Sequence, residues 1–171
     1  LFKKSNQHIT DTAKEFIKRN IDETVNEDPE IKIINKVTSK INIDNKTTNI
    51  LLGVGGSGPT KRIPSKTFIK IINEVSKEKN CNFYLATGKN NEEQIILNEM
   101  LQSKLGKSCV PLDNLSIREI LPIIKNCHIS VCNDSSFSHL SAAIGIKTIT
   151  LMADTPLIYG SYNSKMYPII P

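Results

Sequence analysis

A glycine-rich segment in the first half of the chain has a composition suited to binding an anion. It reads GVGGSGPTKRIP over residues 53–64 and begins at the end of a short apolar run. Glycines in such a place let backbone N–H groups approach phosphate oxygens, and Thr60, Lys61 and Arg62 add a hydroxyl group and two cations. The spacing matches neither the GxGxxG loop of dinucleotide-binding proteins nor the GxxxxGK[ST] P-loop. The glycines alone could serve only a turn, but the three polar residues after them favour an anion site.

A second polar segment, NDSSFSHLSAAIG at residues 133–145, follows another apolar run. Asp134 is placed to cap a helix, and Ser135 and Ser136 fall in its first turn, where free N–H groups and the helix dipole favour an anion. At about 100° per residue, His139 falls on the helix face between the two serines. We therefore expect these polar groups to converge on the end of the preceding strand. Taken separately, Asp134 could be only an N-cap, and His139 could be structural or solvated.

The rest of the chain supplies the elements that must hold these two segments. Five apolar runs have the length of short buried strands, at residues 49–54, 81–86, 108–110, 128–132 and 147–152. Four stretches with helical periodicity alternate with them, at residues 65–79, 91–105, 116–126 and 135–145. Buried strands that alternate with helices of this length are typical of a parallel sheet covered on both faces. We therefore predict an α/β fold, a Rossmann-like doubly wound parallel sheet, with both polar segments at the carboxyl ends of strands.

The region before residue 49 has a different pattern. Apolar residues at helical spacing predict an amphipathic helix at residues 9–19, which needs another surface to pack against. Residues 20–30 are acidic and poor in core residues, as in a surface connection, and residues 31–34 could form a short strand. We therefore divide the chain into a helix and connection at 1–48 and a single Rossmann-like domain at 49–171.

The charge of the chain limits the classes of partner. Its 171 residues carry a net charge of +5, and the sequence pI is about 9.0. The 22 Lys and Arg residues are scattered, and aromatic residues make up only 5% of the chain, whereas a nucleic-acid site would need a basic stripe interleaved with stacking rings. We therefore expect no nucleic-acid partner, while phosphates on a small molecule or an anionic membrane surface remain open.

Two further features bear on where the protein works. No run approaches the roughly 18 consecutive apolar residues of a membrane span, and residues 1–7 lack the apolar core of a secretory signal, so we expect a soluble chain. The four cysteines are isolated in apolar surroundings without CxxC pairing, at Cys81, Cys109, Cys127 and Cys132. We therefore expect buried, reduced thiols and a cytoplasmic location.

Several of these motifs resemble those of glycosyltransferase family 9, the heptosyltransferase family. NDSSFSHLSAAIG is similar to the family's (N)DTGxxHLAAAxG signature, and GSGPTKRIP is similar to its phosphate loop, which ends in TKRWP. Thr87-Gly88 with Glu92 resembles a glycine followed by glutamates, and LMADTPLIYGSY resembles the family's LFGPTDPxxxGPY stretch. The resemblance covers roughly residues 49–171, with a weaker match to an interdomain helix at 8–20.

The resemblance implies a two-domain GT-B glycosyltransferase in which this chain is the C-terminal, donor-binding half. The donor would be a nucleotide-diphosphate sugar such as ADP-heptose, bound as a substrate without a cofactor or metal, and no Asp-x-Asp motif is present to hold one. The acceptor would be a lipopolysaccharide-type or other glycan, with peripheral contact at the inner membrane. The catalytic base would lie in an N-terminal domain outside this chain. The donor-binding residues carried over from the family are Gly56, Ser57, Thr60, Lys61, Glu92, Asp134, Ser135, Ser136 and His139.

One departure from the family pattern keeps other functions open. Ser136 stands where the family has glycine, which adds a side chain at the point where the backbone approaches phosphate. Within the resemblance, Lys61 would contact the donor diphosphate and Glu92 the ribose. The serine at position 136 is compatible with one alternative to the transferase, a nucleotide-binding module without activity. A nucleotide-sugar epimerase of the same architecture is a second alternative.

Overall fold

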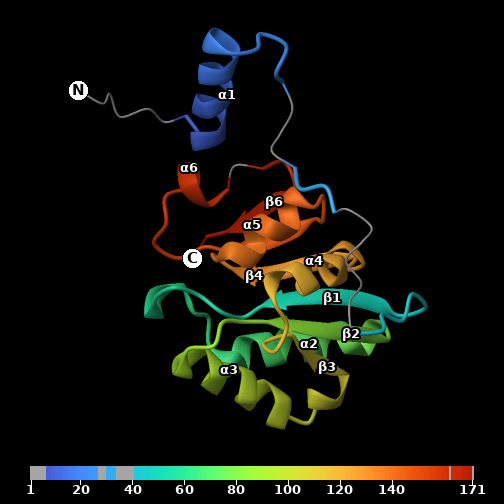
Figure 1. Ribbon diagram of the computed structural model, residues 1–171. Coiled ribbons are helices and arrows are strands. Elements are labelled where there is room, and N and C mark those ends of the chain that lie inside the picture. The colour runs from blue at the N-terminus through green and yellow to red at the C-terminus, as the bar shows by residue number, and fades with distance from the viewer. Residues whose placement is uncertain (1–6, 27–29, 34–40, 162, 171) are drawn as a thin grey trace.

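The computed structural model describes residues 7–26, 30–33, 41–161 and 163–170. Within these residues, six strands form one parallel sheet in the order β3-β2-β1-β4-β5-β6 (Figure 1). The strands are β1 (Thr48–Gly53), β2 (Cys81–Ala86), β3 (Cys109–Pro111), β4 (Ile129–Asn133), β5 (Thr148–Leu151) and β6 (Met166–Ile169). The helices are α1 (Ile9–Asn20), α2 (Ser65–Glu78), α3 (Asn91–Gln102), α4 (Ile117–Lys125), α5 (Ser136–Ala143) and α6 (Leu157–Gly160), with short 3-10 helices η1 (Pro59–Lys61) and η2 (Gly106–Ser108).

The sheet confirms the predicted Rossmann-like, doubly wound architecture. From β1 the chain winds outward through β2 and β3, then returns to β4 beside β1 and winds the other way through β5 and β6. The strand order therefore reverses between β1 and β4, and open α/β sheets bind ligands outside the carboxyl ends of the strands at such a switch point. The five predicted strands and the four predicted helices of the sheet domain are all present, with ends shifted by at most three residues.

The central strands are apolar along their length because helices cover both faces of the sheet. On β1, Ile50 and Leu52 face one core, in which Phe68 of α2 and Met100 of α3 are buried. Leu51 faces the opposite core, to which α4 and α5 contribute. Successive residues of a strand point to opposite faces, so a strand with two buried faces reads as an unbroken apolar run.

The sequence did not predict β6, which pairs with β5 at one edge of the sheet. Its run MYPI is short, contains Pro168 and is mostly exposed, so it lacks the pattern of a buried strand. Proline has no backbone N–H to donate, and edge strands tolerate it because one side of their backbone needs no partner. The edge position therefore explains both the composition of β6 and the failure to predict it.

The connection between α1 and the sheet differs from the prediction. The strand expected at residues 31–34 is absent from its described part, and Ile34 lies outside the described residues, as do residues 27–29 of the expected surface connection. The Ile31 N–H donates to the carbonyl oxygen of Ala143 at the end of α5, at 2.7 Å. This segment therefore bonds to a helix end, where it cannot extend the sheet.

α1 lies outside the layers formed by the sheet and its helices (Figure 1). It confirms the predicted N-terminal helix, and none of its residues is buried. Ile9 and Phe16 are 51% and 61% exposed, which leaves the apolar face of the helix open. No helix in the described part of the chain is both long enough and apolar enough to cross a bilayer.

All four cysteines are buried free thiols, as predicted. Burial raises the pKa of the Cys127 and Cys132 thiols to about 12, so both stay protonated at neutral pH. Cys132 lies directly against Gly53 at the end of β1, where a Cβ atom would lie 2.6 Å from Cys132 Sγ. Glycine is therefore required at this position so that β1 and β4 can approach each other beside the switch point.

We predict that Gly53→Ala destabilises the protein by about 1–3 kcal/mol, the usual cost of overpacking a close-packed core. The added methyl group would meet both Cys132 Sγ and Cys132 Cβ, and Cys132 is completely buried. Urea unfolding followed by circular dichroism measures the change. Gly58→Ala is the matched control, because a Cβ there meets no atom within 4 Å. Equal unfolding midpoints for the two variants would contradict the packing argument.

Candidate functional site

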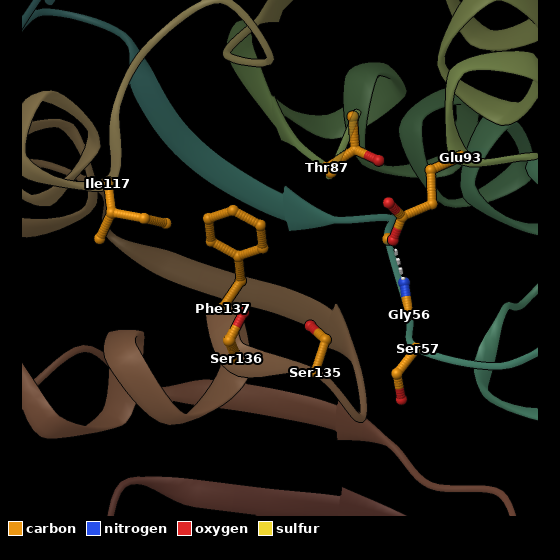
Figure 2. A pocket seen from close by; sticks show the side chains of 10 residues that line it. Gly56, Ser57, Thr87, Glu93, Ile117, Ser135, Ser136 and Phe137 are labelled. Atoms are coloured by element: carbon orange, nitrogen blue, oxygen red, sulfur yellow. Dashed lines mark hydrogen bonds between the residues drawn. The ribbon is translucent and has the colours of Figure 1, made fainter. Parts of the chain in front are cut away.

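A cavity of about 400 Å³ opens at the carboxyl ends of the strands on both sides of the switch point. Four segments far apart in the sequence line it (Figure 2): the loop after β1, the β2–α3 loop with the start of α3, the start of α4 and the start of α5. The lining residues are Gly55, Gly56, Ser57, Thr87, Gly88, Glu93, Ile117, Ser135, Ser136 and Phe137. Both polar segments of the sequence therefore meet at the edge of the sheet where a ligand is expected.

Glu93 connects two of these segments through its carboxylate. The side chain is 7% exposed, and its Oε1 accepts a 2.7 Å hydrogen bond from the Gly56 N–H. Its Oε2 accepts a 2.7 Å bond from the side-chain amide of Asn90, whose own oxygen caps α3 by accepting the Glu93 N–H at 2.9 Å. The carboxylate thus ties the loop after β1 to the start of α3, and the Gly56 N–H is already occupied.

The glycines around Glu93 make room for that carboxylate. A Cβ at Gly55 would lie 2.5 Å from Glu93 Oε1, and one at Gly88 would lie 2.1 Å from Glu93 Oε2. Real Cβ atoms do not approach an oxygen so closely, so any side chain at either position would displace the carboxylate. Gly55 and Gly88 are therefore needed so that the Glu93 carboxylate can lie between the two loops.

Asn133 ties the loop after β1 to the end of β4. Its side chain is completely buried, and Nδ2 donates to the carbonyl oxygens of Val54 at 2.9 Å and Gly55 at 3.3 Å. Its Oδ1 accepts a 3.4 Å bond from the Ile63 N–H at the far end of the same loop. One amide thus fixes both ends of the glycine-rich loop, which shapes the loop before any ligand binds.

A charged cluster lies beside the cavity around Asp134. Lys61 Nζ donates to Asp134 Oδ2 at 2.8 Å, and the Thr155 hydroxyl bonds to the same oxygen. Burial alone would raise the pKa of Asp134, but the hydrogen bonds from Lys61 and Thr155 and the charge of Lys61 outweigh it and hold that pKa below the usual aspartate value. Asp134 is therefore ionised at neutral pH and neutralises Lys61.

Two further contacts extend this cluster. The Thr60 hydroxyl donates to Asp154 Oδ2 at 3.0 Å, so η1 is joined to the loop after β5. His139 Nε2 lies 3.8 Å from Asp134 Oδ1. Burial lowers the pKa of His139, Asp134 opposes the shift and Lys61 adds to it, and the net result is a neutral imidazole at neutral pH. Among the described residues, no group of three or more His, Cys, Asp or Glu side chains could hold a metal ion.

The start of α5 corrects the prediction for Asp134. The N-cap of α5 is Ser135, and Asp134 lies one residue earlier with its carboxylate bonded to Lys61. The expected cap was wrong because a lysine 73 residues away in the sequence takes that carboxylate. The Ser136 and Phe137 N–H groups, at the first two helical positions, have no acceptor within the helix, and they lie at the cavity.

The nine predicted site residues fall into three groups. Four line the cavity: Gly56, Ser57, Ser135 and Ser136. Four form the charged cluster beside it: Thr60, Lys61, Asp134 and His139. Glu92 lies apart from both, because its exposed carboxylate pairs with Arg62 and lines a neighbouring, more open depression of about 490 Å³.

Four residues that shape the site were not predicted from the sequence: Asn133, Glu93, Ile117 and Phe137. Asn133 stands immediately before Asp134, and a polar residue at the end of a buried strand was the signal available for it. Glu93 follows Glu92 directly, so the sequence indicated an acidic pair without indicating which member faces the cavity. Ile117 and Phe137 carried no signal, because apolar residues at a helix start read as core.

A model of the family described as glycosyltransferase family 9 (heptosyltransferase) matches residues 7–167. A search of curated protein sequences finds no match. Among solved structures, E. coli ADP-heptose lipopolysaccharide heptosyltransferase II has a TM-score of 0.65 and 20% identity, over 74% of this chain and 39% of its own. E. coli heptosyltransferase WaaC with ADP has a TM-score of 0.65 and 16% identity, over 74% of this chain and 38% of its own.

The glycosyl transferase of family 9 from Veillonella parvula matches 99% of this chain and 51% of its own, with a TM-score of 0.77 and 13% identity. This chain therefore spans between 38% and 51% of the length of these three solved structures. Likeness at such low identity establishes the fold, which is the Rossmann-like fold of GT-B glycosyltransferases. Because the family model covers almost the whole chain, the chain belongs to glycosyltransferase family 9.

Proposed function

We propose that this chain is the donor-binding part of a glycosyltransferase and that its cavity binds the nucleoside diphosphate of a sugar donor. The observation that carries the proposal is the meeting of the loop after β1 with the start of α5 in one cavity, with Lys61 beside it. Free N–H groups at a helix start suit phosphate oxygens, and here Ser136 and Phe137 supply them. The similar structure of E. coli heptosyltransferase WaaC contains ADP, which supports this class of ligand.

The charges beside the cavity suit a diphosphate leaving group. In the proposed inverting reaction, an acceptor hydroxyl attacks the anomeric carbon of the donor sugar while the bond from that carbon to the diphosphate oxygen breaks. Negative charge then develops on the departing diphosphate. Lys61 and the start of α5 would offset that charge, and fixed groups of this kind need no reorganisation when the bond breaks.

The apolar end of the cavity suits a nucleobase. Ile117 at the start of α4 and Phe137 at the start of α5 lie together at the end of the cavity away from Gly56 and Ser57 (Figure 2). Ile117 is 49% exposed, so burying it under a planar base would remove apolar surface from water. Phosphates between Ser57 and the start of α5, with a base near Ile117, would place the nucleotide along the length of the cavity.

The remaining parts of the proposal concern the whole enzyme. We propose ADP-heptose as the donor and a lipopolysaccharide-type glycan as the acceptor, and the likeness to E. coli ADP-heptose lipopolysaccharide heptosyltransferase II supports both. The catalytic base and the acceptor site would belong to an N-terminal domain beyond this chain. Such an enzyme would work in the cytoplasm at the inner face of the membrane.

We predict that Lys61→Met weakens binding of ADP by about 1.5–3 kcal/mol, the value of a hydrogen bond to a charged group, and leaves adenosine binding nearly unchanged. The ammonium group should face phosphate oxygens and make no contact with the nucleoside. Isothermal titration calorimetry with ADP, UDP, GDP and the matching nucleosides measures the difference. Lys104→Met is the control, because Lys104 lines a separate depression with Lys79 and Lys107, away from the cavity. Equal losses for ADP and adenosine would remove Lys61 from the phosphate site.

We predict that the 171-residue chain binds a nucleoside diphosphate but transfers no sugar on its own. Transfer requires donor and acceptor to be held together, and the proposed acceptor site lies in the other domain. Titration with nucleotide and a sugar-transfer assay, both run beside the full-length enzyme, check the two halves of this statement. Measurable turnover by the chain alone would contradict the proposal that the donor site lies in this chain and the acceptor site in the other domain.

Substitutions at Ser136 distinguish the proposed transferase from the alternative, a nucleotide-binding module without activity. Its side chain is exposed at the cavity, and its hydroxyl can donate to phosphate or obstruct it. We predict that Ser136→Ala weakens ADP binding by about 0.5–1.5 kcal/mol, the net value of one neutral hydrogen bond, whereas Ser136→Gly changes it little because closer backbone approach compensates. The same calorimetry measures both variants. If both tighten binding several-fold, the serine obstructs the site and the module without activity is the better account.

A further inference from the structure

Thr87 carries a buried hydroxyl that has no hydrogen-bond partner among the described residues. The residue lies directly after β2, is 6% exposed and lines the cavity. A buried hydroxyl without a partner is costly, and native proteins rarely keep one that neither a ligand nor water satisfies. The Thr87 hydroxyl therefore points to a ligand group at this wall of the cavity.

The surroundings of Thr87 indicate the charge of that group. A Cβ at Gly55 would lie 3.2 Å from Thr87 Oγ1 and 2.5 Å from Glu93 Oε1, so the hydroxyl and the carboxylate face the same glycine. Both oxygens of Glu93 already accept hydrogen bonds within the protein. A carboxylate beside the same glycine disfavours a phosphate there. The group that meets Thr87 is therefore polar and not an anion, as a neutral hydroxyl group is.

The wall of the cavity opposite Thr87 and Glu93, at the start of α5, favours an anion. Figure 2 shows Thr87 and Glu93 on one side of the end of β1, with Ser135 and Ser136 on the other. The start of α5 presents free N–H groups and the positive end of the helix dipole there, which favour an anion. A ligand that satisfies both walls carries phosphate at one place and neutral hydroxyl groups at another. In a nucleoside diphosphate, those hydroxyl groups are on the ribose.

We infer that Thr87 binds a ribose hydroxyl of the nucleoside diphosphate and makes the site prefer ribose over deoxyribose. This inference rests on the proposed function. The threonine hydroxyl can both donate and accept, so it can pair with a ribose hydroxyl in either direction, whereas the Glu93 carboxylate can only accept. Thr87 is thus the specificity-determining residue on the wall that Glu93 keeps free of phosphate.

The test compares the wild-type chain with Thr87→Val and Thr87→Ser. Calorimetry is run with ADP, UDP and GDP, and then with the 2′-deoxy and 3′-deoxy analogues of whichever binds most tightly. We expect the wild type to bind the ribonucleotide about 2- to 12-fold more tightly than one of the analogues, the range for one neutral hydrogen bond. Thr87→Val should reduce that ratio to about one by weakening only the ribonucleotide, and Thr87→Ser should retain it.

Stability of the empty protein gives a second readout. Valine has the shape of threonine without the hydroxyl, so Thr87→Val should unfold at the same or a higher urea concentration, because it removes an unpaired polar group. A valine variant that keeps the wild-type preference for ribose overturns the inference and leaves the proposed function standing. Failure of the wild type to bind any of the three nucleoside diphosphates overturns the proposed function, and the role of Thr87 with it.

Discussion

The buried carboxylate of Glu93 is the interaction on which the shape of the site depends. An ionised or hydrogen-bonded carboxyl group away from water is tolerated only when its oxygens are paired, and here Gly56 and Asn90 supply the donors. The close approach of Gly55 and Gly88 to this group shows that both loops are folded around it. The glycine-rich loop therefore owes its course to a residue 37 positions further along the chain.

Asn133 completes this arrangement from the other side of the switch point. Glu93 holds the loop after β1 toward α3, and Asn133 holds the same loop toward β4 through Val54 and Gly55. A loop fixed from both sides loses less conformational entropy when a ligand binds, which favours affinity. The two contacts also divide the cavity, because Glu93 places negative charge on one wall while the start of α5 presents N–H groups on the other.

The sequence predicted features that depend on local pattern. Apolar runs, helical periodicity and clustered glycines and serines were enough for the doubly wound sheet and for the convergence of two polar segments. Features set by distant partners could not be predicted. Glu92 and Glu93 are neighbours whose directions differ by about 100° on a helix, and the start of α3 decides which one enters the cavity. The position of Asp134 likewise depended on Lys61, and β6 depended on an edge that only the assembled sheet defines.

The ion pair between Lys61 and Asp134 bears on how the proposed transferase would favour its transition state. A half-buried lysine without a partner would be costly, and Asp134 removes that cost in the empty site. A sugar-bound diphosphate that contacts Lys61 must share it with Asp134, so the gain on binding the donor is smaller than the gain on binding free ADP, whose terminal phosphate carries more charge. When the bond to the sugar breaks, negative charge on the diphosphate increases while that of Asp134 stays constant. The attraction to Lys61 is therefore stronger in the transition state than in the bound donor, and an interaction that strengthens between those two states raises kcat more than it tightens donor binding.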